Sequence, residues 1–469
     1  MLVRTMLAAA LFVTSAAMAQ SEAHRTARDI LEQLIEMDTS PGGIGTTPVA
    51  EAMAERLRGA GFADADIHID GPNAAKKNLV VRLRGKGKKK PMLLIGHMDV
   101  VTALRSDWTT DPYRFIEKDG YFYGRGTQDM KDGIAVMVTT LMRYKRAGLR
   151  PDRDIILALT ADEEGGTSNG VAWLLQHRRD LVDAEFVLNH DGSSVLLENG
   201  KAVQVTVIAS EKVYADFAVT AHNSGGHSSL PVKDNAIYDL AGALQRIAQF
   251  QFPFELNSVT RAYFEHLLTR ADKSHAADLR GALQTPPDSA AVARLSSRTI
   301  ENALTHTTCV ATRVEAGHAN NALPQTATAT VNCRILPGHS PEETRQALIR
   351  FIANPEVTVK YVELDGSLAN VAPDTQGIAP PPLRPDVMRP LEKIAGKMWP
   401  DAVVVPVMAA GATDSVHTSA AGLPTYLVSG LALERDDIRA HGQDERIPVT
   451  SFYRSVDFYY QYLKAVASY

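Results

Sequence analysis

The chain has 469 residues, of which 45% are hydrophobic and 22% are charged, and it contains 32 Gly and 24 Pro. This composition is typical of a folded protein of about three domain-sized units, and it excludes collagen, coiled coils and wholesale disorder. Lys and Arg (49) nearly balance Asp and Glu (54), so the formal net charge is only -5. We therefore expect no general electrostatic attraction to nucleic acid or to an anionic membrane, and small molecules or peptides are the expected partners.

The first residues predict an export signal. Arg4 is followed by an apolar run over residues 6–17 and by the small-residue stop Ala17-Met18-Ala19, which is typical of a cleavable signal peptide over residues 1–19. The apolar run is shorter than the roughly 20 residues that cross a bilayer; an uncleaved anchor is the alternative. We expect a secreted or periplasmic protein that has no membrane contact after cleavage.

Helix and strand patterns alternate over residues 20–210 and predict the first part of a catalytic α/β domain. Apolar spacing predicts two helices within residues 29–61, and later helices at 133–147 and 169–177. Short apolar runs bounded by turn residues predict strands between them. Such alternation is typical of a sheet flanked by helices, here a mixed sheet, whose strand ends collect ligands. The expected strands are 78–83, 91–96, 153–160 and 184–189.

A basic run over residues 82–90 lies between two of these strands. It is short and lacks the interleaved aromatic residues of a nucleic-acid surface, so we interpret it as a solvated hairpin turn.

The pattern changes after about residue 210 and predicts a smaller α+β domain over residues 211–365. It begins with an alternating strand at 214–220 and continues through a charged helical segment at 253–305 to strands around 307–336. A proline-rich spacer at 372–386 follows, and residues 366–469 are expected to complete the catalytic domain.

The chain has only two cysteines, so no disulfide framework holds the fold. Cys309 and Cys333 are equidistant from Asn321, where a turn-like segment separates two Thr/Val-rich strand candidates. A hairpin there would place the cysteines opposite each other and allow one disulfide. Two separate buried thiols are the open alternative.

The polar residues at the expected strand ends and in one late loop are of the types that bind metal ions. Imidazole nitrogen and carboxylate oxygen are the donors of catalytic zinc, and a pair of ions would need about five protein ligands with one bridging carboxylate. Each residue alone has a simpler explanation as a solvated loop residue or helix cap, so the indication comes from their joint recurrence. These residues are His97, Asp99, Asp129, Glu163, Glu164, Asp191 and His441.

The motifs around these residues resemble, in order and spacing, the M20 family of metallopeptidases, which includes aminoacylases, carboxypeptidases and dipeptidases. The resemblance covers nearly the whole mature chain. It implies a zinc exopeptidase-like catalytic domain interrupted by a lid or dimerisation domain, and the long segment 253–305 is similar to that of the carboxypeptidase S-like branch. The matching motifs are Gly96-His97-Met98-Asp99, Gly124-Arg125-Gly126-Thr127-Gln128-Asp129, Asp162-Glu163-Glu164-Gly165, Asn189-His190-Asp191-Gly192, Gly225-Gly226-His227-Ser228, Asn321-Ala322-Leu323-Pro324, Gly411-Ala412-Thr413-Asp414 and His441-Gly442.

The resemblance implies two zinc ions per chain. His97 and Asp191 would hold one ion, Glu164 and His441 the other, and Asp129 would bridge both. Asp99 would orient His97. Cobalt or manganese could occupy the same donor set, because ligand type constrains the metal without choosing it.

The resemblance also assigns catalytic and substrate-binding roles. Glu163 would act as the general base, taking a proton from the attacking water and passing it to the leaving nitrogen. In dimeric relatives the histidine that matches His227 reaches the partner subunit's site to polarise the substrate carbonyl, so a homodimer through the lid domain is expected. Asn321, Arg334 and Thr413 match substrate contacts, and a guanidinium group suits a carboxylate.

Two residues depart from the family pattern or compete with a ligand. Asp132 replaces a common glycine, and we expect it on the first turn of a helix, where a carboxylate interacts favourably with the helix dipole. His190 is a rival ligand to Asp191. Because neighbouring strand residues point to opposite faces, only one of the two should reach the metals.

We therefore expect an exported zinc-dependent hydrolase that cleaves a peptide or N-acyl amino acid at an amide bond. The sequence does not separate a carboxypeptidase or dipeptidase from an N-acyl-amino-acid hydrolase, because pocket side chains decide that choice. A non-catalytic binding protein that has lost its metal is the alternative from another class, and it would predict damage at Glu163 or the ligands, all of which are present.

Overall fold

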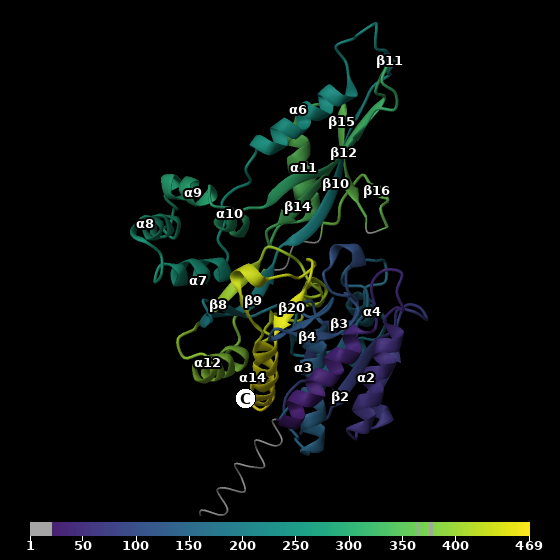
Figure 1. The fold of residues 1–469 in the computed structure, drawn as a ribbon. Coiled ribbons are helices and arrows are strands. Elements are labelled where there is room, and N and C mark those ends of the chain that lie inside the picture. Colours follow the sequence, from purple (N-terminus) through teal and green to yellow (C-terminus); the bar gives the residue numbers. More distant parts are fainter. Residues whose placement is uncertain (1–20, 364, 375–378) are drawn as a thin grey trace, which may run out of the picture. The chain divides into compact units, whose positions relative to one another are not determined.

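The computed structural model describes residues 21–363, 365–374 and 379–469, which divide into two compact units (Figure 1). The first unit contains the described residues up to Val207 together with 382–405 and 417–469, and the second contains 208–381 and 406–416. The predicted signal peptide lies outside the described residues. Among the residues that are described, no helix is both long and apolar enough to cross a bilayer.

The second unit continues beyond residue 365, where we expected the smaller domain to end. Strand β16 (Leu368–Ala369) pairs antiparallel with β15 (Val357–Val362), and this pairing keeps the following chain in the second unit as far as Pro381.

A ten-stranded mixed sheet forms the centre of the first unit, with the order β1-β2-β6-β3-β7-β18-β9-β8-β19 and with β17 paired to β9. Three neighbouring strands, β6, β3 and β7, run parallel to one another. Both β3 and β6 are buried along their whole length, as expected for parallel strands covered on both faces. The strands are β1 (Ile67–Asp70), β2 (Asn78–Leu83), β3 (Met92–His97), β6 (Ile155–Thr160), β7 (Phe186–Asn189), β8 (Val195–Glu198), β9 (Lys201–Glu211), β17 (Val403–Ala409), β18 (Thr425–Leu427) and β19 (Ala432–Glu434).

Helices cover both faces of this sheet, as the alternating pattern predicts. On one face α4 (Gly170–His177) and α5 (Arg179–Val182) contribute to a core that includes Leu93 and Val187. The other helices and a small three-stranded sheet complete the unit. Residues 21–35 are helical, and the remaining elements are α2 (Thr47–Gly59), α3 (Lys131–Arg146), α12 (Pro385–Met398), α13 (Ser415–Ala420), α14 (Val449–Ala467), β4 (Ile116–Lys118), β5 (Tyr121–Tyr123), β20 (Arg446–Pro448) and the short 3-10 turns η1 (Asp64–Asp66), η2 (Arg105–Asp107) and η3 (Arg435–Asp437).

The expectation of a hairpin turn at residues 82–90 is wrong. Strand β6 lies between β2 and β3, antiparallel to the first and parallel to the second. The basic segment is therefore a crossover, because two strands that each pair with the same central strand cannot form a hairpin with one another.

A five-stranded antiparallel sheet with the order β12-β14-β10-β15-β16 is the framework of the second unit. Helices α6 and α11 lie on one face of it, and Figure 1 shows α7 to α10 as a separate group beside them. Ser340 begins α11 with a capping box formed with Glu343. The bounds are β10 (Val213–His222), β11 (Gly226–His227), β12 (Thr308–Ala316), β13 (Ala322–Leu323), β14 (Thr326–Ile335), α6 (Ala236–Gln249), α7 (Ser258–Leu267), α8 (Lys273–Ala282), α9 (Ser289–Ser296), α10 (Thr299–Thr305) and α11 (Pro341–Ile352).

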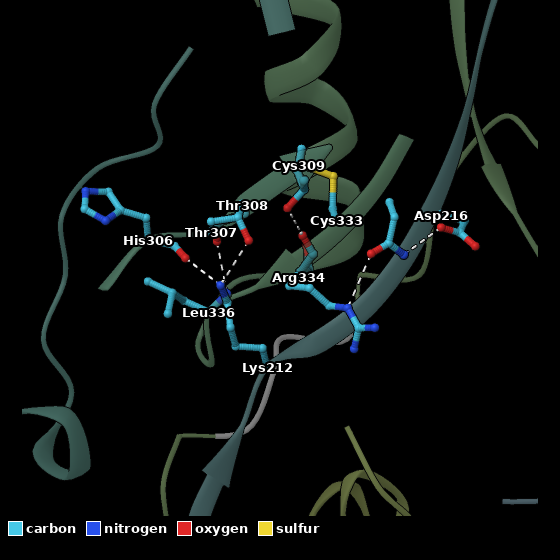
Figure 2. Close-up of a disulfide and its surroundings, with 12 residues drawn as sticks. Lys212, Asp216, His306, Thr307, Thr308, Cys309, Cys333, Arg334 and Leu336 are labelled. Carbon is cyan, nitrogen blue, oxygen red and sulfur yellow. Dashed lines mark hydrogen bonds between the residues drawn. A yellow bond between two sulfur atoms is a disulfide. The ribbon is translucent and has the colours of Figure 1, made fainter. Parts of the chain in front are cut away.

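The two cysteines form a disulfide between β12 and β14, where they are directly opposite each other with their Cα atoms 4.1 Å apart (Figure 2). Beside it, the buried Lys212 donates to the carbonyl oxygens of Ala303 and His306 at 2.9 and 2.7 Å. The disulfide and this lysine together fix the start of β12 to the sheet of the second unit.

Candidate metal centre

Three parallel strands deliver side chains to one edge of the first unit's sheet. His97 is the last residue of β3, the pair Glu163 and Glu164 follows the end of β6, and Asp191 follows the end of β7. Because these strands are neighbours and run in the same direction, their carboxyl ends meet at one edge.

Two further residues reach the same place from loops. Asp129 lies two residues before the first residue of α3, and His441 lies in the loop between η3 and β20. His441 has a φ of 64°, an uncommon left-handed conformation for a residue other than glycine.

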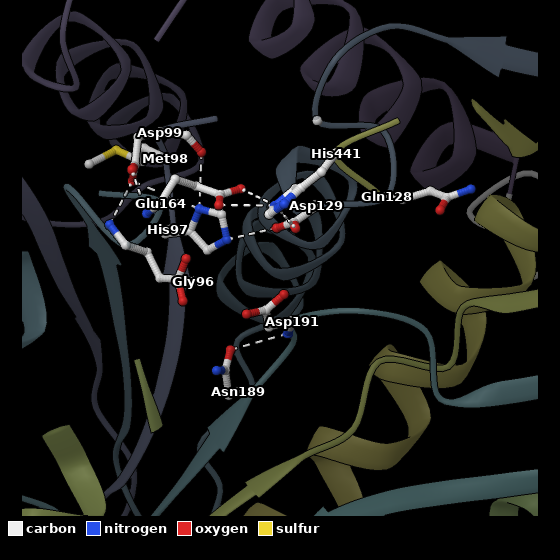
Figure 3. A network of polar contacts seen from close by, with 12 residues as sticks. Gly96, His97, Met98, Asp99, Gln128, Asp129, Glu164, Asn189, Asp191 and His441 are labelled. Carbon is white, nitrogen blue, oxygen red and sulfur yellow. Dashed lines mark hydrogen bonds and ion pairs between the residues drawn. The ribbon is translucent and has the colours of Figure 1, made fainter. Parts of the chain in front are cut away.

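The carboxylate of Asp129 lies between the two imidazole rings (Figure 3). Its Oδ1 is 2.9 Å from Nε2 of His97, and its Oδ2 is 3.0 Å from Nε2 of His441. Nε2 of His441 is also 3.0 Å from Glu164. Ligand atoms of His97, Asp129 and Glu164 all lie within 4.8 Å of one another, so Asp129 occupies the central position that a bridging ligand requires.

Asp191 completes the group. Figure 3 shows its carboxylate on the side of Asp129 and His97, and its main-chain N–H donates to Oδ1 of Asn189 at 3.1 Å. The structure thus gathers all five predicted ligands at one site of the first unit.

The electrostatics of this site favour a positive charge. Burial alone would lower the pKa of His97, but Asp129 and Glu163 outweigh it and hold the pKa well above its usual value. Asp129 and Glu164 likewise raise the pKa of His441 to about 10. The carboxylates therefore stabilise cationic imidazoles here, and the same nitrogen and oxygen donors suit zinc. The residues present fit a metal centre.

Asp99 orients three groups at once. The carbonyl oxygen of this buried residue accepts from Nδ1 of His97 at 3.0 Å, which places the ring's second nitrogen, Nε2, toward Asp129. Its two carboxylate oxygens accept the main-chain N–H groups of Glu163 and Glu164 at 3.2 and 3.0 Å. The contact that fixes His97 is thus mainly with the Asp99 main chain, while the Asp99 carboxylate fixes the glutamate pair.

Glu445 is a functional residue that the sequence did not indicate. Its buried carboxylate forms an ion pair with Arg125 and accepts the main-chain N–H groups of Gly126, Gln128 and Asp129. It therefore holds the loop that carries Asp129. The one available signal was its position four residues after His441, which is weak because this loop contains several acidic residues.

The two residues that depart from or compete with the family pattern are both buried. Asp132 lies in the first turn of α3, where burial raises its pKa well above the usual value and a hydrogen bond with the Gly133 main chain opposes this rise. The ring of His190 packs against Gly133 and Tyr459, whereas the side chain of Asp191 faces the other ligands.

The remaining predicted residues belong to the second unit. His227 and Asn321 are close to each other, because β11 pairs with β13 and the N–H of Ser228 donates to the carbonyl of Asn321 at 3.0 Å. Nδ1 of the exposed His227 accepts from the main-chain N–H of Ser229 at 3.2 Å. The neutral ring therefore carries its proton on Nε2, which is left as a hydrogen-bond donor.

Arg334 and Thr413 are each held by neighbours in the second unit. The guanidinium group of Arg334 lies 4.6 Å from the ring centre of Tyr214. Thr413 donates its main-chain N–H and its hydroxyl to the carboxylate of Glu211 at 3.0 and 2.9 Å. Glu211 is a second residue that the sequence did not indicate, and it fixes the loop of Thr413.

Comparison with known proteins identifies the family. The model of peptidase family M20/M25/M40 matches residues 93–465. The N-fatty-acyl-amino acid synthase/hydrolase PM20D1 of Xenopus tropicalis is 30% identical over 384 residues, which are 80% of this chain and 72% of that protein. A probable carboxypeptidase S-like protein 2 of Dictyostelium discoideum is 28% identical over 407 residues, or 84% of this chain and 75% of that protein.

Solved structures confirm the α/β fold with its second domain. The M20 family metallo-carboxypeptidase Sso-CP2 from Sulfolobus solfataricus superimposes with a TM-score of 0.69 at 17% identity, covering 94% of this chain and 99% of that one. The YXEP protein of Bacillus subtilis, described as a dinuclear metal-binding peptidase of the M20 family, gives a TM-score of 0.56 at 11% identity over 95% and 98% of the two chains. This chain therefore belongs to peptidase family M20/M25/M40 and is a hydrolase of peptide or related amide bonds.

Proposed function

We propose that the chain is an exported two-zinc hydrolase that cleaves the amide bond of a C-terminal amino acid carrying a free carboxylate. The observation that carries this proposal is the position of Asp129, whose two oxygens each face a different imidazole, those of His97 and His441. A carboxylate in this position can bridge two ions. His97 and Asp191 would hold one ion, and Glu164 and His441 the other.

When bound, the metal ions would lower the pKa of a coordinated water toward neutrality and polarise the substrate carbonyl. Glu163 would accept the proton of the attacking water and transfer it to the leaving nitrogen. The Asp99 carboxylate supports this division of roles, because it fixes the main chain of Glu163 and Glu164 through separate oxygens. Adjacent glutamates can then present one base and one ligand.

His227 would donate a hydrogen bond from Nε2 to the substrate carbonyl oxygen, since Ser229 occupies its Nδ1. By family resemblance it would do so in the partner subunit's site of a homodimer. The edge strand β12, on which Val310 and Val314 are each 58% exposed, supports an association through the second unit. Asn321 and Arg334 would contact the substrate carboxylate, and Thr413 the bound substrate.

Export is supported by the pattern of residues 1–19 and by the disulfide between Cys309 and Cys333, which suits an oxidising compartment. The acyl side of the substrate is either a peptide, as the carboxypeptidase S-like relatives suggest, or a fatty acyl group, as the PM20D1 relative suggests. Both classes share the C-terminal amino acid that is released.

The test is metal analysis of the purified mature protein together with hydrolysis of matched substrates. A dipeptide and an N-acyl amino acid with the same C-terminal residue would each be compared with its C-terminal carboxamide. We expect about two zinc ions per chain, chelator-sensitive cleavage and strong preference for the free carboxylate. Equal cleavage of the carboxamides would contradict the substrate assignment, and folded protein that binds no zinc would contradict the metal assignment.

A further inference from the structure

The residues adjacent to three proposed ligands pack against one another behind the metal centre. Gly96 precedes His97 in the chain, Met130 follows Asp129, and His190 precedes Asp191. Because successive strand residues point to opposite faces, Gly96 lies on the face of the sheet away from His97. His190, one residue beyond β7, packs beside Gly133. Both residues meet α3.

Two glycines form part of this contact, and an added Cβ atom at either would meet a neighbouring side chain. A Cβ atom on Gly133 of α3 would lie 2.5 Å from Nδ1 of His190 and 2.8 Å from Cε of Met130. A Cβ atom on Gly96 would lie 2.7 Å from Cε of Met130 and 2.7 Å from Cε of Met137. The four residues Gly96, Met130, Gly133 and His190, which we call the ligand floor, are therefore so closely packed that an added methyl group at either glycine would displace a neighbouring side chain.

The ring of His190 is the rigid member of the ligand floor. It is 1% exposed, and its centre lies 4.7 Å from the ring of Tyr459 on α14, at an interplanar angle of 66°. Among the described residues, no donor or acceptor lies in hydrogen-bonding geometry with either nitrogen of the His190 ring. Packing between α3 and α14 therefore holds the ring, and through the shared main chain it holds Asp191.

We propose that the ligand floor is a positioning device that sets the spacing of His97, Asp129 and Asp191, with His190 transmitting the position of α3 to Asp191. This inference rests on the metal site proposed above. A methyl group on Gly133 would displace the His190 ring, and the ring would move Asp191 because the two residues are joined by one peptide unit. A methyl group on Gly96 would instead meet the flexible end of Met130, which can move aside. The device therefore predicts different sensitivities at the two glycines.

The test compares five variants for zinc affinity, by competition with a chelator, and for the visible spectrum of the cobalt-loaded protein: three single glycine variants, His190→Ala, and one double variant. Gly133→Ala should weaken zinc binding by about tenfold or more and shift the cobalt absorption bands. Substitution of residues that support metal ligands typically lowers metal affinity about 10–100-fold. Gly96→Ala should have a smaller effect. Gly396→Ala, in α12 with no atom within 4 Å of the new Cβ, is the matched helix control and should bind zinc as the wild type does.

The double variant, Gly133→Ala with His190→Ala, separates positioning from general damage and is compared with His190→Ala alone. In the His190→Ala background there is no imidazole ring for the new methyl group to displace. Adding Gly133→Ala to His190→Ala should therefore change zinc affinity by about twofold or less. Wild-type affinity and an unshifted cobalt spectrum in Gly133→Ala would overturn the inference. If Gly133→Ala does not fold, His190→Ala decides, since zinc binding equal to that of the wild type would also overturn it. A wild type that binds no zinc would instead contradict the proposed function.

Discussion

Glu445 accepts the main-chain N–H of Asp129 at 3.2 Å across 316 residues of sequence. The same carboxylate neutralises Arg125, and both side chains are almost fully buried, at 0% and 3% exposure. The position of Asp129 thus depends on a buried ion pair that holds its main chain.

We expect Glu445→Gln to lower the free energy of unfolding by about 3–5 kcal/mol, because it leaves the guanidinium of Arg125 buried without a counter-charge. Zinc affinity should fall as well, since an uncharged amide oxygen accepts the main-chain N–H groups of the Asp129 loop more weakly than the carboxylate does. Chemical denaturation of the metal-free protein and zinc competition would measure the two effects. Glu392→Gln, on an exposed position of α12, is the control. Unchanged stability in Glu445→Gln would show that the ion pair does not support the loop.

The roles assigned to Glu163 and His97 predict different effects on zinc content and turnover. Glu163→Gln should keep the wild-type zinc content but lose about 10²–10⁴-fold in kcat, the contribution of a general base. His97→Ala should lose zinc and activity together, because it removes a ligand. Metal analysis and steady-state kinetics on the same preparations would check both. Equal zinc loss in the two variants would contradict the division of roles.

His227 offers a test of the homodimer. His227→Ala and Glu163→Gln should each be inactive alone. If His227 acts in the partner subunit's site, a mixed dimer contains one site in which both residues are intact, so activity should return to as much as about half that of the wild type per mixed dimer. Differently tagged chains would be refolded together, and purified mixed dimers assayed. Mixed dimers that stay inactive would place His227 in the site of its own subunit, and a His227→Ala variant that is active alone would place it outside the reaction.

The sequence predicted where the proposed ligands gather because strand ends are readable from local patterns. Short apolar runs mark the ends of β3, β6 and β7, and parallel neighbours bring His97, Glu164 and Asp191 together. The alternation rule also predicted that only one of His190 and Asp191 would face the metals.

The supporting contacts could not be predicted in the same way. Glu445 and Glu211 accept hydrogen bonds from main-chain N–H groups of distant loops. Almost every residue type has such an N–H group, so the sequence of the loop does not reveal the contact. The supposed hairpin at 82–90 failed for a related reason: β6, which separates the two strands, follows them by more than fifty residues in the chain. Long-range pairing is decided by packing of the whole sheet.

Glu211 predicts a pH dependence of stability. Burial raises its pKa to about 7 against the hydrogen bonds from Thr413, while the usual value is 4.5. The native state therefore holds this proton more tightly than the unfolded state does. The stability gained in this way is fully present below pH 4.5 and is lost as the pH rises through about 7.

In Glu211→Gln the amide mimics the protonated acid at every pH. The difference in unfolding free energy between variant and wild type should therefore be constant below about pH 4.5, increase in favour of the variant by at most about 1.4 kcal/mol per pH unit up to about pH 7, and level off above it. Denaturant unfolding of the metal-free proteins at a series of pH values would measure this, with Glu392→Gln as the exposed control. A pH-independent difference would show that the pKa of Glu211 is the same in the native and unfolded states, and would contradict the prediction.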